Sequence, residues 1–440
     1  MDGQPTPEVI EQIRDIPIYR ESLAKGHFPV LDKPEIARGF PDNWMTPRLA
    51  AALESGDAEF VLSTGTHHAR MQIIRPPYFL LHSYYQLWRA HPDIGDTWES
   101  GCRRVSLTTV LATEHVARVN AARRGADPAP VPALDDRWLD ERTCYLNLRL
   151  DPALWERAEV VRMLKEIQDA RQAHPRGWYH LDCSGYHLAH LLRKVGKWGL
   201  WDDFPPPASI IHAYEYTPAN VRRFLHQHFA CPVIDLFGST ELGYLYFSDR
   251  RGTYWPHLDK MTVELHPVAP DSTLYELIVS SVRNPYMPLI RYRSGDCVRT
   301  LDGTPDPGKI SQFSGRQKEL LSTPDGPVAQ GDLDRCIAEV SPHVFVYQLQ
   351  LTGDAEARLA YTTFQGAPLD PDRAAALAEA IGALTGRRCR TEHRGHLPIG
   401  KSGKYAWLTT ATDPDDALPG QEKHDQPAVD IRRRSQATAR

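Results

Sequence analysis

The sequence lacks any long apolar run. Its longest stretches of that kind, such as residues 78–81 and 277–279, fall far short of the ~20 apolar residues that a transmembrane helix needs. The first residues, 1–14, are polar and acidic, without the basic start and apolar stretch of a secretory signal. We therefore expect a cytoplasmic protein that has no membrane among its partners.

The chain also lacks a basic excess and a cysteine framework. Lys and Arg number 51 against 56 Asp and Glu, and the resulting net charge of −5 disfavours a nucleic-acid partner. The seven cysteines are scattered, and no two of them form a C-x-x-C pair. This pattern predicts reduced, mostly buried thiols rather than disulfides or a structural zinc site.

What the sequence does contain is typical of a folded globular protein. Of its 440 residues, 41% are apolar and 24% are charged. Proline is over-represented, with 36 residues against 29 glycines, which predicts many fixed loop starts and short elements. A prior of ~150 residues per domain allows three domains, and two unequal ones fit as well.

Apolar periodicity and capping residues predict an α/β protein. Asp151 and Pro152 are expected to open a long helix, because Asp is a good N-cap and Pro suits the first turn. The helices predicted in this first part span residues 6–14, 46–55, 153–173 and 219–229. The strands span residues 60–62, 232–237, 260–265 and 273–281, and residues 125–137 are expected to form a loop.

The pattern changes after Gly315. The elements expected there are strands over 344–352, 358–364 and 387–394 and a helix over 370–384. This βαβ-type unit of about a hundred residues predicts a separate small domain. Residues 413–440 have no apolar periodicity and are expected to form a disordered tail.

Two motifs after predicted strands carry residue types that suit phosphate chemistry. The first motif is the small, hydroxyl-rich run Ser63, Thr64, Gly65 and Thr66. A loop of this kind can wrap a phosphate with its N–H groups and hydroxyls. The second motif, Phe237-Gly238-Ser239-Thr240-Glu241, offers a ring for stacking on a base and oxygens for phosphate and Mg²⁺. The alternative for both is an ordinary turn at the end of a strand.

Two further motifs carry charge at fixed places. Asp296 follows the run from Pro288 to Gly295, and an aspartate after a tight turn suits bidentate bonding to two ribose hydroxyls; a solvated edge strand is the alternative. In the run Leu397 to Lys404, two lysines flank a Ser-Gly pair inside a loop. Taken alone, that run is typical of a basic surface loop.

In this order the motifs resemble those of the adenylate-forming superfamily of acyl-CoA synthetases, adenylation domains and luciferases. The length and the early loop are most similar to its phenylacetate–CoA ligase-like branch. The family patterns S-S-G-T-T-G-K, Y-G-x-T-E, R-Y-R-T-G-D, G-R-x-x-D and L-P-x-T-x-S-G-K correspond here to residues 63–70, 237–241, 291–296, 315–319 and 397–404. The resemblance implies a large N-terminal α/β domain over 1–314, with mixed sheets flanked by helices, and a small, mobile α+β C-terminal cap over 315–412.

The resemblance also implies a two-step reaction. A carboxylate attacks the α-phosphate of ATP, giving an acyl-adenylate and pyrophosphate, and a thiol or amine then displaces AMP. The implied catalytic residues are Lys404, which bridges the carboxylate and the α-phosphate, Thr240 on the α-phosphate, and Glu241, which binds Mg²⁺. The implied nucleotide-binding residues are Ser63, Thr64, Gly65, Thr66, Tyr214, Glu215, Phe237, Gly238, Ser239, Asp296 and Arg316, and the implied hinge is Lys318.

The sequence departs from the family pattern in three places. In the phosphate loop, His68 and Ala69 stand where the pattern has glycine and lysine, and Arg70 follows one position later. Tyr214 is bulky where the family's Gly-Ala-Glu has alanine, so it either stacks on the adenine or reshapes the pocket. Residues 320–332 do not match the glycine-rich run that helps to form the family's CoA tunnel, which leaves CoA as one of several acceptors.

The aromatic- and histidine-rich run from Trp178 to Tyr186 falls where the family binds its acyl group. The residues expected to line an aryl-carboxylate pocket are Tyr179, His180, Asp182, Tyr186 and Gly243. His180 and Asp182 are candidates for recognising a hydroxyl or amino group of the substrate. Tyr179 serves equally well as a plain core residue.

Three functions therefore stay open. The first is ATP-dependent adenylation of a small, aromatic carboxylic acid followed by transfer to a thiol such as CoA. The second is adenylation with another acceptor (an amine or a carrier protein) or of a small inorganic acid, in secondary metabolism. The third is a catalytically reduced nucleotide-binding protein. We expect a monomer or homodimer in each case.

Overall fold

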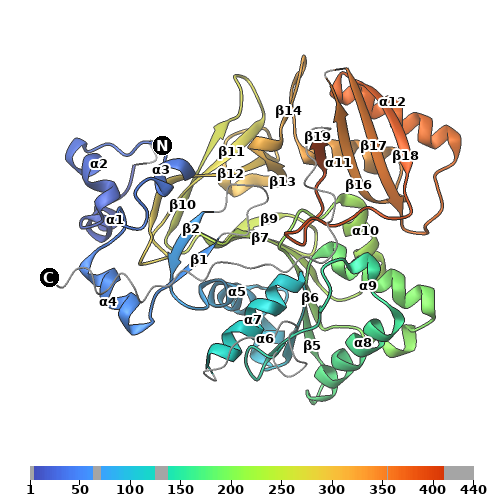
Figure 1. The fold of residues 1–440 in the computed structure, drawn as a ribbon, viewed down its shortest axis with the longest axis horizontal. Helices are drawn as coiled ribbons and strands as arrows, with labels where there is room; N and C mark the ends of the chain where they lie inside the picture. The colour runs from blue at the N-terminus through green and yellow to red at the C-terminus, as the bar shows by residue number, and fades with distance from the viewer. Residues whose placement is uncertain (1–3, 63–70, 124–136, 354, 411–440) are drawn as a thin grey trace.

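A seven-stranded sheet forms the centre of the computed structural model, which describes residues 4–62, 71–123, 137–353 and 355–410 (Figure 1). The strand order is β4-β3-β5-β6-β7-β8-β9, with the first five strands parallel and the last two antiparallel. The strands are β3 (Arg103–Leu107), β4 (Thr143–Tyr145), β5 (Tyr179–Cys183), β6 (Ser209–His212), β7 (Val233–Ser239), β8 (Gly243–Ser248) and β9 (Tyr254–Pro256). The carboxyl ends of the parallel strands meet at one edge, where open α/β sheets bind ligands.

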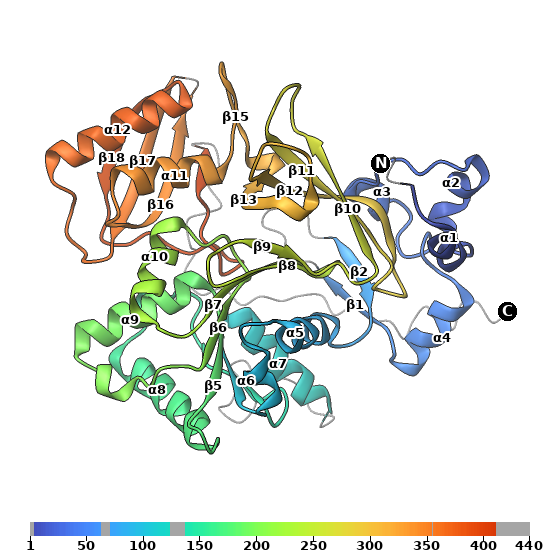
Figure 2. The ribbon, with the colours of Figure 1, turned by 180° about the vertical axis from the view of Figure 1, so that it is seen from behind.

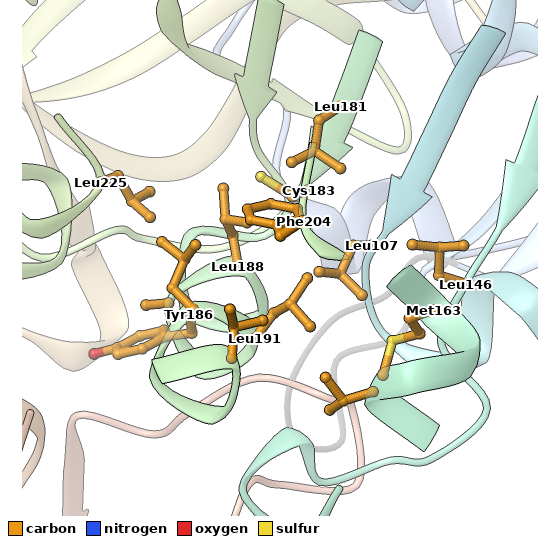
Figure 3. Close-up of a cluster of buried hydrophobic side chains, with 14 of the residues drawn as sticks. Leu107, Leu146, Met163, Leu181, Cys183, Tyr186, Leu188, Leu191, Phe204 and Leu225 are labelled. Carbon is orange, nitrogen blue, oxygen red and sulfur yellow. The ribbon is translucent and has the colours of Figure 1, made fainter. Parts of the chain in front are cut away.

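Different helices cover the two faces of this sheet, because side chains alternate along each strand. The helices are α5 (Phe79–Ala90), α6 (Gly95–Glu99), α7 (Val110–Arg123), α8 (Arg157–Gln172), α9 (Gly185–Trp198) and α10 (Ala219–His228). Leu107 and Leu181 join the core that α8, α9 and α10 build on one face (Figure 3). Ile211 and Ile234 point to the other face and pack with Trp88 of α5.

A second, antiparallel sheet has the order β10-β11-β12-β13 and shares a core with the N-terminal helices. Its strands are β10 (Met261–Pro267), β11 (Leu274–Ser281), β12 (Leu289–Thr300) and β13 (Ile310–Arg316). The N-terminal elements are α1 (Pro7–Ile13), α2 (Arg20–Lys25), α3 (Lys33–Ala37), α4 (Pro47–Ser55) and the hairpin of β1 (Glu59–Leu62) and β2 (Gln72–Arg75).

The C-terminal part forms a small α+β cap on this large N-terminal domain. The cap comprises β14 (Leu321–Thr323), β15 (Gly326–Val328), α11 (Gln330–Val340), β16 (Val344–Thr352), β17 (Glu356–Thr363), α12 (Pro371–Thr385), β18 (Arg388–His393) and β19 (Leu408–Thr410). Four of its strands form a sheet in the order β18-β17-β16-β19, which we call the C-terminal sheet. Figures 1 and 2 show this sheet beside α10, with α12 on its outer side.

The cap is packed firmly against the large domain. Phe345 and Val346 of β16 belong to the same buried cluster as α8 and α9. Asp334 of α11 accepts a hydrogen bond at 2.9 Å from the N–H of Ala219, the first residue of α10, and another at 2.8 Å from Tyr216. The residue at the N-cap position of α10 is Pro218, whose side chain cannot accept a hydrogen bond from the helix. Asp334 of the C-terminal domain therefore supplies the carboxylate that caps α10.

Most of the elements predicted from the sequence are confirmed, but one helix start was wrong. The helix predicted from 153 begins at Arg157. Asp151 and Pro152 open only a 3₁₀ turn (Pro152–Leu154), and Trp155 then has an extended ψ of 133°. Glu156 caps α8 instead, with Glu159 bonding back to its N–H at 2.8 Å. An acidic residue does cap this helix, as predicted, but it is Glu156, five residues after Asp151.

Cysteines and helix lengths also bear on the sequence predictions. All seven cysteines are free thiols, and four of them are buried, as expected. Within the described ranges, no helix is both long and apolar enough to cross a membrane.

Candidate active site

Residues 397–404, which we call the lysine loop, lie against the carboxyl ends of the central strands. The loop turns tightly, with the Gly403 N–H donating to Gly400 at 2.8 Å and the Gly400 N–H donating to Lys404 at 2.9 Å. Gly403 has φ +71°, and a Cβ there would lie 1.9 Å from Thr109 Oγ1, just beyond β3. Only glycine fits this position, since both the backbone angle and the close approach exclude a side chain.

Lys404 stands among charged groups from three other segments. Burial and the Arg316 guanidinium lower the pKa of Lys404, while Glu215 and Asp296 act in the opposite direction. These four residues come from the lysine loop, the end of β13, the segment after β6 and β12. The structure thus gathers at one point four residues that the sequence assigned to catalysis and nucleotide binding.

Asp296 and Arg316 face each other across neighbouring strands. They are register partners on β12 and β13, and Arg316 Nε lies 3.9 Å from Asp296 Oδ1. Burial raises the pKa of Asp296, against the lowering effect of Arg316. Two strands of one sheet therefore fix the distance between a carboxylate and a guanidinium at the site.

Glu241 lies close to this pair and is almost fully buried. It is 6% exposed and accepts a hydrogen bond at 2.8 Å from Tyr292 OH, on the same strand as Asp296. Burial and the Glu241 carboxylate both raise the pKa of Tyr292, so this phenol stays protonated and donating. The bond orients one oxygen of Glu241.

The turn between β7 and β8 carries the rest of the motif 237–241, and two stretches of backbone pass very close to each other there. A Cβ on Gly238 would meet the Gly243 oxygen at 2.3 Å, and Gly243 itself has φ +79°. Ser239 Oγ accepts a hydrogen bond at 3.3 Å from the Leu242 N–H, and Thr240 occupies the turn. The two glycines therefore hold Thr240 and Glu241 at the end of the sheet.

Phe237 packs against β13, and Lys318 follows the end of that strand. The Phe237 ring stacks on Phe313 with centroids 3.7 Å apart, so one face of the predicted adenine-stacking ring is covered by protein. Lys318 is in the 3₁₀ turn Gln317–Glu319 that follows β13, and burial lowers its pKa. Its hinge role stays a prediction.

Glu215 lies between the lysine loop and the start of α9. Its side chain is 6% exposed and accepts a hydrogen bond from Ser184, the N-cap of α9. Its other oxygen accepts from the Tyr405 N–H at 3.4 Å. Burial raises the pKa of Glu215 to about 7, against the lowering effects of Ser184 and Lys404.

Tyr214 is held in an unusual backbone conformation. Its φ is +79°, in the left-handed region that side chains rarely adopt. Its hydroxyl donates to both oxygens of Asp182, at 2.9 and 2.8 Å. Asp182 is fully buried, pairs with Arg104 and accepts from Ser106 at 2.9 Å. A buried ion pair thus anchors the strained tyrosine.

The five residues predicted to line the acyl pocket do not share one surface. His180 and Asp182 face α5, where His180 bonds Tyr84 at 2.6 Å and stacks on Trp88 at 4.0 Å. Tyr179 alternates to the other face and donates to Pro205 at 2.6 Å, as part of the core. Tyr186 also belongs to that core, whereas Gly243 lies in the β8 crossing. Alternation along β5 therefore puts Tyr179 on the opposite face of the sheet from His180 and Asp182, and the pocket role of the set stays a prediction.

The predicted phosphate loop cannot be placed. Ser63, Thr64, Gly65 and Thr66 lie outside the described residues, together with His68, Ala69 and Arg70. Its role stays a prediction.

Comparison with solved structures bears on the fold. The chain superposes on 2-hydroxyisobutyryl-CoA ligase in the postadenylation state, in complex with R3-HIB-AMP, with a TM-score of 0.62 and 11% identity. That match covers 92% of this chain and 88% of the ligase. The fold is that of the adenylate-forming enzymes. ATP-bound MatB from Rhodopseudomonas palustris matches with a TM-score of 0.50 and 12% identity, over 78% of this chain and 65% of MatB. No family model matches this sequence, and no curated protein does.

The adenylate-forming fold raises the question of a magnesium site. Among the described residues, no three His, Cys, Asp or Glu side chains form a group that could hold a metal ion. Glu241 fits a single-carboxylate contact, since its bond to Tyr292 uses only one of its two oxygens. Mg²⁺ is usually held by one or two carboxylates plus substrate phosphates, so this donor set suits an ion that arrives with ATP.

Sequence reasoning missed several residues of this candidate site. Tyr292 lies inside a quoted motif, R-Y-R-S-G-D, but its bond to Glu241 joins residues 51 positions apart. Arg104 and Thr109 belong to no motif and gain their place only from the packing of β3. Tyr405 directly follows Lys404, and an aromatic residue next to this loop was the one local sign in the sequence that Tyr405 belongs to the site.

Proposed function

We propose that this protein is an AMP-forming ligase that adenylates a small carboxylic acid with ATP and passes the acyl group to a thiol. The observation that carries the proposal is the meeting of Lys404 with Glu215, Asp296 and Arg316 beside Glu241. A partly buried ammonium in such a place stabilises charge that develops between two anions more strongly than it would in water.

The roles of the residues follow from their chemistry. Lys404, a compact cation, contacts the attacking carboxylate and the α-phosphate together. Asp296 accepts hydrogen bonds from the ribose hydroxyls, and Arg316 holds Asp296 in place. Thr240 contacts the α-phosphate from the β7–β8 turn. Glu241 would hold Mg²⁺, and the ion would supply positive charge beside the pyrophosphate oxygens.

We further propose that the acid is aromatic, as in the phenylacetate–CoA ligase-like branch. Tyr84 and Tyr244 have ring centroids 5.9 Å apart, and both lie in the cluster that Tyr214 packs against. These rings support a flat, apolar acyl group beside Gly243. The named ligase with the same fold acts on a hydroxyisobutyryl group, so small aliphatic acids belong in the same panel.

Exchange of labelled pyrophosphate into ATP, measured over a panel of aryl and short aliphatic acids, tests this function. The proposal predicts exchange with at least one acid, and a thioester when CoA and that acid are added together. Exchange without a thioester would instead favour another acceptor. That alternative is raised by residues 320–332, which do not match the family's glycine-rich run. Nucleotide binding without exchange for any acid would contradict the proposed ligase.

A further inference from the structure

Tyr405 joins the lysine loop to the N-terminal domain through its side chain. Its hydroxyl bonds His190 Nε2 at 2.9 Å, and its ring packs edge-on against Tyr186 with centroids 4.7 Å apart. Both partners lie on α9, more than 200 positions earlier in the chain. Every one of these contacts therefore requires the loop to lie where it does now.

The partners of Tyr405 are themselves fixed. His190 is 3% exposed, and burial keeps its pKa well below the ordinary value, so the ring is neutral and forms a single directed bond with the phenol. Its ring also packs on Phe345 of the cap at 4.7 Å. A rigid, neutral partner defines one position for the tyrosine hydroxyl.

The backbone of Tyr405 is held from a second direction. Its N–H donates to Glu215, and Glu215 in turn accepts from Ser184 at the start of α9. His187 Nδ1 lies 3.0 Å from the same Ser184 hydroxyl, which completes a buried polar chain behind the loop. One residue, Tyr405, is thus tied by main chain and side chain to two points of the large domain.

Lys404 cannot be placed independently of this neighbour. Consecutive Cα atoms are ~3.8 Å apart, so fixing Tyr405 restricts where the Lys404 ammonium reaches. On the other side Gly403 packs against Thr109. We propose that Tyr405, docked on His190 and Glu215, is a positioning residue that sets Lys404 for adenylation. This inference rests on the proposed function for its role, although the docking itself is testable without any substrate.

Competitive acetylation of the free protein tests the docking. Lys401 and Lys404 lie in the same loop, but Lys401 is exposed and Lys404 is partly buried, so their labelling ratio with trace acetic anhydride reports how well Lys404 is covered. Acetic anhydride reacts only with the free amine, and the pKa of Lys404 is lowered, so the ratio is taken for the free-amine forms from a pH series of labelling rates. We expect the free amine of Lys404 to label several-fold less than that of Lys401 in the wild type. Tyr405→Phe should raise the Lys404 to Lys401 ratio by ~3-fold or more, because one hydrogen bond of typical strength is lost.

The matched control is Tyr179→Phe, which removes another buried phenol bond, to Pro205, far from the loop. It should leave the ratio unchanged. His190→Gln, as a second variant, should raise the ratio as Tyr405→Phe does, and the double variant should add little more because both remove one contact. A ratio in Tyr405→Phe and His190→Gln equal to the wild-type value would overturn the docking.

The half-reactions then separate positioning from plain stability. With any acid that supports exchange, Tyr405→Phe should lower pyrophosphate exchange by up to ~10-fold and leave thiol attack on a supplied acyl-adenylate at its wild-type rate. Equal loss in both half-reactions would overturn the positioning role. Absence of exchange in the wild type would contradict the proposed function, while the acetylation ratio would still decide the docking.

Discussion

At the scale of single residues, burial decides which charges this site can hold. Glu215 and Lys404 are both shifted toward neutrality by burial, and each is shifted back by the other. Each of these two groups therefore offsets only part of the effect of burial on the pKa of the other. Glu215 is the member of the pair whose pKa, about 7, falls inside the accessible range.

We predict that Glu215→Gln stabilises the fold at alkaline pH. The folded pKa of Glu215, about 7, lies above the unfolded value of 4.5, so the folded state binds more protons between these values. Stability contributed by this group is present below pH 4.5 and falls as the pH rises through 7. Melting temperatures at pH 5 and pH 8 should show a gain for Glu215→Gln at pH 8 that shrinks at pH 5, whereas the exposed Glu339→Gln should shift neither. An equal effect at both pH values would contradict this assignment.

At the scale of elements, much of the fold was predictable because local signals decide it. The helices at 6–14, 46–55, 219–229 and 370–384 begin at a proline or a capping residue, and the structure has them within a residue or two. The start of α8 was not predictable, because Asp followed by Pro at 151–152 is a stronger helix-start signal in the sequence than Glu156. The residues of the predicted acyl pocket divide between two faces of the sheet for a tertiary reason, since strand alternation separates residues adjacent in sequence, and their pocket role stays a prediction.

The α10 N-terminus gives an element-scale prediction. Asp334→Ala removes its capping carboxylate and should cost about 2 kcal/mol of stability, at the upper end for an N-cap because the residue is also buried. Hydrogen exchange should speed up in the first turn of α10, in the other domain. Asp370→Ala, which removes the exposed cap of α12, should affect only α12. Unchanged exchange in α10 would show that Asp334 does not act as its cap.

At the scale of the whole molecule, the cap has a core of its own and also adds side chains, Phe345 among them, to one core cluster of the large domain. Phe345 packs on Tyr186 and under Arg193, which lies 4.6 Å from its ring. Arg193 also donates to main-chain oxygens of Thr363 and Phe364, at 3.1 and 2.8 Å. The sequence placed a boundary at 315 and said nothing of this interface, because no local pattern reports contacts between distant segments.

We predict that Phe345→Ala loosens the cap. Truncating this buried ring should cost about 3 kcal/mol and increase native-state trypsin cleavage at Lys318, which joins the two parts. Phe28→Ala, a matched truncation in the core of the N-terminal helices, should cost a similar amount in denaturant unfolding without increasing that cleavage. Equal cleavage in both variants would argue against a shared interface core.

The proposed function depends above all on Lys404, which lies where the cap meets the large domain. Pyrophosphate exchange by Lys404→Ala, beside Lys401→Ala as the loop-matched control, tests it most directly. We expect exchange to fall by about a hundredfold or more in Lys404→Ala with ATP binding retained, and to stay near the wild-type rate in Lys401→Ala. Wild-type exchange in Lys404→Ala would contradict it.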